Sequence, residues 1–292
     1  MSVRSRAAHE PEAVLGPVAM AQARSSKGET CVVQSRLNPH SDTGSGHSRV
    51  SFGDSLRVSL LLVPHNRGPF EDQLAELLAI EREVLQAKGP VMKITAQTVF
   101  LRNPGDERLC RQLLAKHHGV ELPATNFVLQ PPCCGAALAL EVWAIGGDNV
   151  AVKYCNPHTV RVEHDQAQWT YCGGIRSESP KADAYDQTRE VLGKMRNALE
   201  KAGSGFEQVV RTWLYLGGIT EAEAGSQRYK ELNRARSEFY RQIQFHCSPS
   251  QPNIPQGIYP ASTGIGMGGS ELVAGCLAFH TKRADAFLVA LE

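Results

Sequence analysis

The sequence has 292 residues, 42% of them hydrophobic and 21% charged, which are the proportions of a globular protein with one or two cores. Its 31 lysines and arginines nearly balance its 30 aspartates and glutamates, and the formal charge is +1. So small a charge argues against a general electrostatic hold on nucleic acid. No apolar run approaches the roughly 20 residues that span a bilayer, so neither nucleic acid nor a membrane is an expected partner.

The first 48 residues differ in composition from the rest of the chain. They are rich in Ser, Ala, Gly, His and Arg, as in RSSKGE (24–29) and NPHSDTGSGHS (38–48), and show neither a helical nor a strand period. Such a segment buries too little apolar surface to offset the entropy of ordering it. The sequence therefore predicts a disordered arm over residues 1–48.

Strand and helix patterns then alternate, and they predict a first unit over residues 49–147. Its elements, in chain order, are a strand (57–63), a helix (69–89), a strand (92–101), a helix (106–119) and two strands (126–130 and 136–145). The first helix has a one-sided apolar stripe that includes Leu74 and Leu77. Gly89 and Gly119 end the two helices.

The same order recurs in residues 148–292, which form the predicted second unit. Its elements are three strands (150–155, 160–164 and 168–174), a helix (182–203), a strand (207–216), a helix (221–242) and the segments 259–266 and 271–280. The apolar stripe of the first of these helices is Ala184, Thr188, Val191, Leu192, Met195 and Leu199.

Matching residues at equivalent places in the two units indicate that the units are repeats. Helix-ending Gly89 corresponds to Gly203, TVFL (98–101) to WLYL (213–216), and Pro123-Ala124 to Pro260-Ala261, at offsets of 114, 115 and 137. We interpret this as a tandem duplication of an α+β unit in which two helices pack on one face of a mixed sheet. The alternative is that two unrelated sandwiches share this order by chance.

The eight cysteines and ten histidines give no sign of a metal or disulfide framework. The cysteines are scattered, without a CxxC pair, which favours a reducing cytoplasm. Glu10 and Glu12 interrupt the apolar N-terminal stretch, which argues against a signal peptide. His117 and His118 fall at a predicted helix end, where cations are favoured. No metal site and no cofactor are expected.

The segment Tyr259-Pro-Ala-Ser-Thr-Gly-Ile-Gly is a candidate anion site. Pro260 fixes its entry, Ser262 and Thr263 supply hydroxyls, and the glycines from Gly264 onward let backbone N–H groups turn to one side. These features predict a loop that binds a carboxylate or a phosphate. A simple turn before the last strand is the alternative.

Arginines precede this segment. Arg234 and Arg236 share a predicted amphipathic helix with Arg228, Tyr229 and Tyr240, and Arg211 lies on an otherwise apolar strand. A cation on such a strand is costly unless it is paired or used. Each arginine taken singly fits a surface role. Taken together with the glycine segment they favour a carboxylate or di-anionic ligand, because Arg makes bidentate contacts to carboxylates.

Glu141 in ALALEVWAI is a candidate catalytic acid. A lone carboxylate among apolar neighbours should have a raised pKa. In the repeat it aligns with Gly275, so only the first unit holds a carboxyl group there. An outward-facing Glu on a half-exposed strand is the alternative.

Four segments together resemble one family. QTREVLGKMRNALEKAG (187–203), VVRTWLYL (209–216), YKELNRARSEFY (229–240) and YPASTGIG (259–266) resemble the Rid (YjgF-like) superfamily, and most closely its chorismatase branch. The resemblance covers roughly residues 50–290. It implies two Rid-like units in one chain, with the ligand site mostly in the second unit.

The resemblance also implies a reaction, the hydrolysis of chorismate with release of pyruvate and without a cofactor. An enol ether is cleaved when its methylene carbon is protonated and water attacks the oxocarbenium ion, so the site needs anion clamps and one acid. The implied clamps and walls are Arg211, Tyr215, Arg234, Arg236, Tyr259, Ser262, Thr263, Gly264 and Cys172, the last from the YCGG turn (171–174).

Two other functions stay open. A Rid-type enamine or imine deaminase is one, although such enzymes carry an Arg directly after the Pro-Ala of this motif, where Ser262 and Thr125 stand here. A non-catalytic module that binds a small carboxylate is the other. Hydrolytic chorismatases have a C-terminal extension that supplies an acid, so either the chain is truncated or the acid comes from elsewhere. We expect a monomer or a homotrimer.

Overall fold

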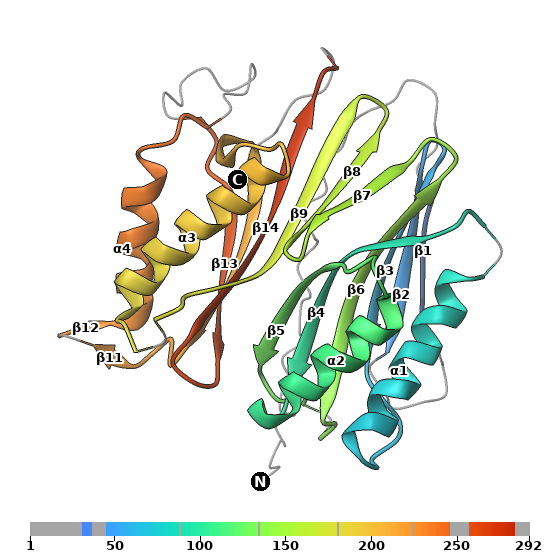
Figure 1. Cartoon of the computed structure of the whole chain (residues 1–292), viewed down its shortest axis with the longest axis horizontal. Helices are drawn as coiled ribbons and strands as arrows, with labels where there is room; N and C mark the ends of the chain where they lie inside the picture. The colour runs from blue at the N-terminus through green and yellow to red at the C-terminus, as the bar shows by residue number, and fades with distance from the viewer. Residues whose placement is uncertain are drawn as a thin grey trace, which may run out of the picture.

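The structure is a computed structural model, and it describes residues 31–36, 45–87, 89–133, 135–179, 181–223, 225–245 and 257–283. Figure 1 shows two sheet-and-helix units side by side. Among the described residues no helix is long and apolar enough to cross a membrane.

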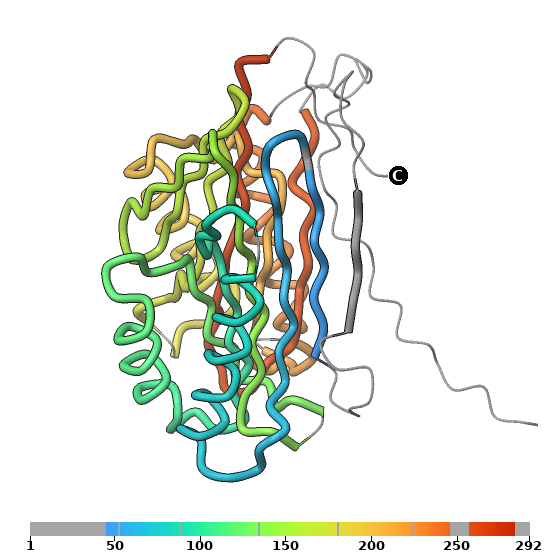
Figure 2. Tube along the Cα trace, turned by 90° about the vertical axis from the view of Figure 1, so that its right-hand side faces the viewer, coloured from blue at the N-terminus to red at the C-terminus, as the bar shows by residue number. Residues whose placement is uncertain are grey.

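The first unit is a six-stranded mixed sheet with two helices. Its strands are β1 (Cys31–Arg36), β2 (Gly46–Phe52), β3 (Ser55–Leu62), β4 (Lys93–Leu101), β5 (Ala124–Leu129) and β6 (Leu138–Gly147), in the order β1-β2-β3-β6-β4-β5. Neighbouring strands are antiparallel except β4 and β5, which are parallel. The helices α1 (Phe70–Leu85) and α2 (Glu107–His118) lie on one side of these strands (Figure 2).

The second unit repeats this plan. Its strands are β7 (Ala151–Asn156), β8 (Thr159–His164), β9 (Ala167–Arg176), β10 (Val209–Gly217), β13 (Ala261–Met267) and β14 (Leu272–Thr281), in the order β13-β10-β14-β9-β8-β7. Only β10 and β13 run parallel. The helices are α3 (Ala184–Lys201) and α4 (Arg228–Tyr240), which pack against each other. Short elements complete it: η2 (Phe206–Gln208), β11 (Ala222–Glu223) and β12 (Ser226–Gln227), while η1 (Pro104–Asp106) precedes α2.

The strand registers confirm the predicted α+β class and the duplication. Ala96 pairs with Ala124 in the first sheet, and Arg211 pairs with Ala261 in the second. Thr98 faces Glu141 across β4 and β6, and Trp213 faces Gly275 across β10 and β14. Glu141 and Gly275 are therefore equivalent positions, as the sequence alignment predicted.

Each unit has its core between the sheet and its two helices. In α1 the stripe of Leu74 and Leu77 is fully buried against Leu140 and Val142 of β6. In α3 all six residues of the predicted stripe are buried. This packing leaves alternate residues of β6 and β10 on the opposite face of each sheet, because successive strand side chains point to opposite faces.

Several boundaries differ from the predictions. Most of the predicted arm lies outside the described residues, but Cys31–Arg36 forms β1, because it can pair with the edge of β2. The predicted helix over 221–242 begins only at Arg228, after the hairpin of β11 and β12. The YCGG segment is not a turn but part of β9, where Gly174 has a φ of +68°.

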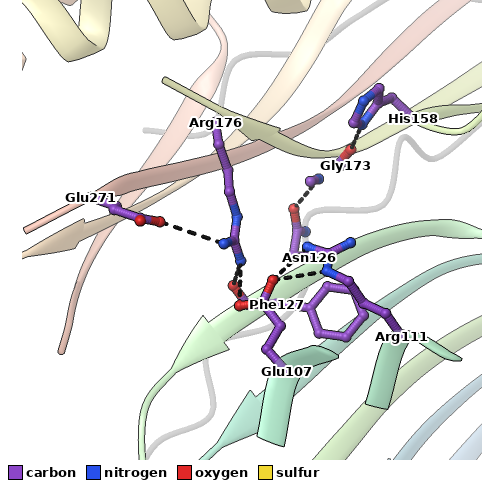
Figure 3. A network of polar contacts seen from close by, with 9 residues as sticks. Glu107, Arg111, Asn126, Phe127, His158, Gly173, Arg176 and Glu271 are labelled. Atoms are coloured by element: carbon purple, nitrogen blue, oxygen red, sulfur yellow. Dashed lines mark hydrogen bonds and ion pairs between the residues drawn. The ribbon is translucent and has the colours of Figure 1, made fainter. Parts of the chain in front are cut away.

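The two units meet where β5 crosses β9. Gly174 N donates to Asn126 Oδ1 at 2.8 Å, and Arg176 donates to the carbonyl oxygen of Phe127 at 3.0 Å. Arg176 also forms ion pairs with Glu107 at 3.1 Å and Glu271 at 3.4 Å (Figure 3). One arginine at the end of β9 thus joins α2 and β5 of the first unit to Glu271, the residue that precedes β14.

Gly275 fits this junction because it has no side chain. A Cβ there would lie 2.8 Å from the carbonyl oxygen of Cys172 and 3.0 Å from the amide nitrogen of Asn126. We therefore expect Gly275→Ala to lower the free energy of unfolding by about 1–3 kcal/mol. Gly193→Ala is the matched control, since nothing lies within 4 Å of a Cβ there and the change should stabilise α3 by up to about 1 kcal/mol. Urea unfolding measures both, and equal effects would contradict the close contact.

Candidate active site

A small pocket lies between the two sheets, on the faces that the helices leave uncovered. Its lining comes from both units: Thr98, Glu141 and Trp143 from the first, Cys172, Trp213 and Tyr215 from the second. Three of these are aromatic, and Trp143 stacks edge to face on Trp213 with ring centroids 5.5 Å apart. The pocket therefore combines an apolar wall with one carboxylate.

Glu141 reaches this pocket because of its place on β6, between β3 and β4. Leu140 and Val142 on either side of it point into the helix-side core, so Glu141 points the other way. Glu141 is therefore partly covered by the second unit and lies beside Trp213 and Tyr215 in the pocket lining, although it keeps some exposure to solvent. Burial raises the pKa of Glu141, and a hydrogen bond from Trp143 partly opposes that rise. Trp143 Nε1 donates to Glu141 Oε1 at 3.1 Å, which leaves Oε2 to carry a proton.

Tyr215 comes from the second unit and is 3% exposed. Burial, and then the charge of Glu141, raises the pKa of Tyr215 to about 12, while a hydrogen bond with Thr98 opposes the rise. The hydroxyl therefore stays protonated at neutral pH and can donate a hydrogen bond. Its coupling to Glu141 places these two groups, from different units, in one electrostatic site.

Arg211 lies on the same face of β10, two positions before Trp213 and four before Tyr215. Its guanidinium donates to Thr263 Oγ1 at 2.6 Å and lies 5.5 Å from the centroid of the Trp213 ring. Its charge also acts on Tyr215. Arg211 is half-buried and is absent from the ion pairs found among the described residues, and it lies next to the pocket rather than in its lining.

Cys172 lines the pocket together with Cys276, its partner across β9 and β14. Burial, and then a hydrogen bond with Cys172, raises the pKa of the Cys276 thiol. A protonated thiol is a poor nucleophile. Cys172 lines the pocket but also belongs to the core that α3 covers, so its role in the pocket wall stays a prediction.

A second group of predicted residues lies on the other side of β13. Arg236, Tyr259 and Ser262 line a surface hollow of about 550 Å³ between α4 and β13. Ser262 Oγ lies 2.6 Å from Thr212 Oγ1, and a Cβ on Gly264 would lie 2.7 Å from the ring of Tyr229. These residues therefore face α4 and not the pocket of Glu141.

Arg234 belongs to neither group. Its side chain is 55% exposed and pairs with Glu231 at 2.6 Å. Its guanidinium lies 3.8 Å from the centroid of the Tyr185 ring. The hypothesis that Arg234 clamps the ligand together with Arg211 is therefore wrong in this geometry, because the two cations lie on different surfaces.

The predicted anion-binding loop is also corrected. Ala261–Met267 forms β13, whose residues pair in register with Arg211–Gly217 of β10. Amides engaged in a sheet alternate in direction and do not converge on an anion. What β13 contributes to the pocket side is Thr263, through its bond to Arg211.

Sequence reasoning missed Trp143, Trp213 and Thr98 as pocket residues. A signal was present, because Thr98 and Trp213 are equivalent in the repeat and Trp143 lies two positions after Glu141. Strand alternation alone would have placed Trp143 and Glu141 on one face. That the two faces meet was not visible in the sequence.

A comparison with known families found one match in this part of the chain. Residues 141–278 match the family described as "Chorismatase FkbO/Hyg5-like, N-terminal". The predicted resemblance to chorismatases is thereby confirmed for this part of the chain. The chorismatase match begins at Glu141 and includes Cys172, Arg211 and Tyr215. A comparison with curated protein sequences gave no match.

A comparison with solved structures found similar chains, among them a chorismatase and two proteins of E. coli. A chorismatase is 15% identical with a TM-score of 0.43, and the similarity covers 76% of this chain and 54% of that one. TdcF of E. coli, solved with bound serine, is 14% identical with a TM-score of 0.31, and covers 41% of this chain and 86% of its own. The YjgF gene product of E. coli is 15% identical with a TM-score of 0.30, and the similarity covers 42% of this chain and 86% of that one. The present chain thus spans about half of that chorismatase.

Proposed function

We propose that this protein is a chorismatase-like hydrolase that cleaves the enolpyruvyl ether of chorismate or of a related cyclic carboxylic acid. The observation that carries the proposal is Glu141, a carboxyl group with a raised pKa in a pocket shared by both units. A carboxyl group whose pKa is raised by burial is better suited to general acid catalysis than an exposed one. The family match over residues 141–278 supplies the substrate class.

In the proposed reaction Glu141 transfers its proton to the methylene carbon of the enol ether. Water then adds to the resulting oxocarbenium ion, and the hemiketal collapses to pyruvate and the ring alcohol. Trp143 holds Oε1 of Glu141, so the acidic proton is on Oε2. Tyr215 donates a hydrogen bond to the substrate, and Arg211 binds a substrate carboxylate as a charged, bidentate donor.

The free pocket is narrow, with a volume of about 30 Å³, which is roughly the space of one water molecule. A ring of chorismate size must therefore displace aromatic walls, and Trp143 and Trp213 form the wall between the sheets. We expect saturating chorismate to change the tryptophan fluorescence of the protein, and the change to become smaller in Trp213→Phe, which keeps only Trp143 in the wall. Trp169, the third tryptophan, stacks on Phe279 outside the pocket and serves as the reference. An unchanged spectrum at saturating ligand would contradict binding in this pocket.

A coupled assay for pyruvate with chorismate as substrate tests the reaction itself. Steady release of pyruvate supports the proposal. If the folded protein consumes no chorismate, the proposal is wrong. Ammonia released from a dehydroamino acid would instead support the deaminase.

The narrow pocket also favours one alternative, a module that binds a small carboxylate without turnover. It would show ligand-dependent thermal stabilisation that follows RT ln(1 + [L]/Kd), with no product. A thermal-shift screen of small carboxylic acids, run beside the pyruvate assay, separates the two functions.

We propose further that residues 49–147 and 148–292 are the two domains and that the protein acts in the cytoplasm without a cofactor, as a monomer or homotrimer. The cysteines Cys110, Cys133, Cys155, Cys172 and Cys276 are free thiols, in keeping with a reducing compartment. Size-exclusion chromatography with light scattering distinguishes the two oligomeric states.

A further inference from the structure

Three side chains with metal-binding atoms meet between α1 and α2. They are Glu81 of α1 and His117 and His118 of α2, and one ligand atom from each lies within 4.8 Å of the others. His117 Nε2 is 3.0 Å from Glu81 Oε1. Both helices cover one face of the first sheet (Figure 1), the face to which Leu140 and Val142 point, whereas Glu141 points to the other. The cluster is therefore separate from the proposed active site.

Two atoms in this cluster are buried without a hydrogen-bond partner. The Glu81 side chain is 2% exposed, and its Oε2 has no partner among the described residues. His118 Nε2 is likewise buried and unpartnered. Leaving a carboxylate oxygen and an imidazole nitrogen unpaired in the protein interior costs free energy. A group that satisfies both atoms at once would remove this cost.

We infer that Glu81, His117 and His118 bind a divalent transition-metal ion, with Zn²⁺ as the best-suited ion. Two imidazoles and one carboxylate form a donor set that suits Zn²⁺. Such an ion takes both unpartnered atoms as ligands and replaces the proton between His117 and Glu81. A water molecule completes the tetrahedron, and the His117 side chain, 16% exposed, leaves a path for it.

The surroundings are compatible with this ligand set. The His118 imidazole can bind an ion through Nε2, which has no hydrogen-bond partner among the described residues. Arg82 lies beside the cluster, with its Nη2 3.5 Å from His117 Nδ1. Arg82 is exposed and can turn into solvent when the metal-bound imidazole carries its proton on Nδ1.

A plain ion pair is the competing explanation, with a protonated His117 beside Glu81. It accounts for the 3.0 Å contact but gives no role to His118 Nε2 or to Glu81 Oε2. The ion pair and the metal site therefore predict different behaviour when His118 is changed. A bound metal ion would join α1 to α2, so it should also stabilise the first unit against unfolding.

Isothermal titration of the full chain with ZnCl₂ after treatment with a chelator tests the inference. We expect one zinc per chain, a rise in melting temperature with zinc but not with Mg²⁺, and d–d absorption typical of tetrahedral Co²⁺ when cobalt replaces zinc. In His118→Ala the affinity should fall by at least about 100-fold, and the melting temperature without zinc is measured beside it, because the ring also packs edge to face on His117.

His65→Gln is the matched control. His65 also faces a carboxylate, with Nδ1 3.1 Å from Glu76 Oε1, but lies in an exposed pair outside the cluster. It should bind zinc like the unaltered protein. Glu81→Gln is a second variant, to be used with circular dichroism because it removes a buried charge. Absence of zinc binding to the folded chain, or equal binding by His118→Ala, would overturn the inference.

Discussion

Glu141→Gln is expected to lower kcat for pyruvate release from chorismate by about 100- to 10,000-fold, the usual contribution of a general acid. Gln keeps the shape of the side chain and can still accept the hydrogen bond of Trp143, but it has no proton to transfer to the methylene carbon. Substrate binding should survive, so KM should change much less than kcat. The coupled pyruvate assay measures both parameters.

The pH dependence gives an independent test of the same residue. Because burial raises the pKa of Glu141, and only the protonated group is an acid, kcat/KM should fall as the pH rises through that raised pKa. The contribution of Glu141 to the stability of the fold should also fall as the pH rises. Burial of the ionised carboxylate is unfavourable, so its stabilising neutral form is fully present below the unfolded pKa and is lost as the pH rises through the folded pKa. Glu141→Gln should therefore melt at the same or a higher temperature at neutral pH.

Glu163→Gln provides the control for this experiment. Glu163 is also a strand glutamate, but its side chain is 53% exposed and pairs with Arg161 at the surface. It should keep the activity and the pH profile of the unaltered protein. Wild-type rates in Glu141→Gln would rule out Glu141 as the acid and with it the proposed mechanism.

The parts of the fold that the sequence predicted depend on local patterns. The stripe of Ala184, Val191 and Leu199 follows the helical period, and all three side chains are buried. The equivalence of Glu141 and Gly275 follows from matched residues that recur in the same order in both units, at offsets of 114, 115 and 137, and the strand registers confirm it. The helical period and the matched residues of the two units were enough to predict these features, because each depends on short stretches of sequence.

The errors concern pairing between distant segments. The glycine-rich stretch 261–267 has the composition of a loop but forms β13, because β10, about 50 residues earlier, supplies its hydrogen-bond partners. In α4 nearly every face carries a polar side chain, so the helical period could not show that Arg234 faces solvent while Leu232 is buried. The meeting of Glu81 with His117, 36 residues apart, has no local signal either.

Arg211→Ala and Arg234→Ala should have opposite outcomes, and this contrast tests where the substrate is held. Arg211 is half-buried beside Trp213 and acts on Tyr215, so its loss should remove a charged hydrogen bond to a substrate carboxylate. Such a bond contributes about 1.5–3 kcal/mol, and kcat/KM should fall by roughly 10- to 150-fold. Arg234 pairs with Glu231 at the surface, and its loss should change kcat/KM by less than about twofold, since surface pairs contribute little.

Arg211→Lys refines the contrast, because it keeps the charge and removes the planar fork. A bidentate contact predicts that Lys restores only part of the activity, whereas a purely electrostatic role predicts nearly full recovery. The pyruvate assay at several chorismate concentrations separates kcat from KM for all three variants. If Arg234→Ala loses activity and Arg211→Ala keeps it, the substrate binds on the outer side of α4, and the pocket of Glu141 cannot be the active site. If Arg211 alone matters, the carboxylate clamp comes from the second unit and the acid from the first, and the junction of the two sheets is then necessary for catalysis.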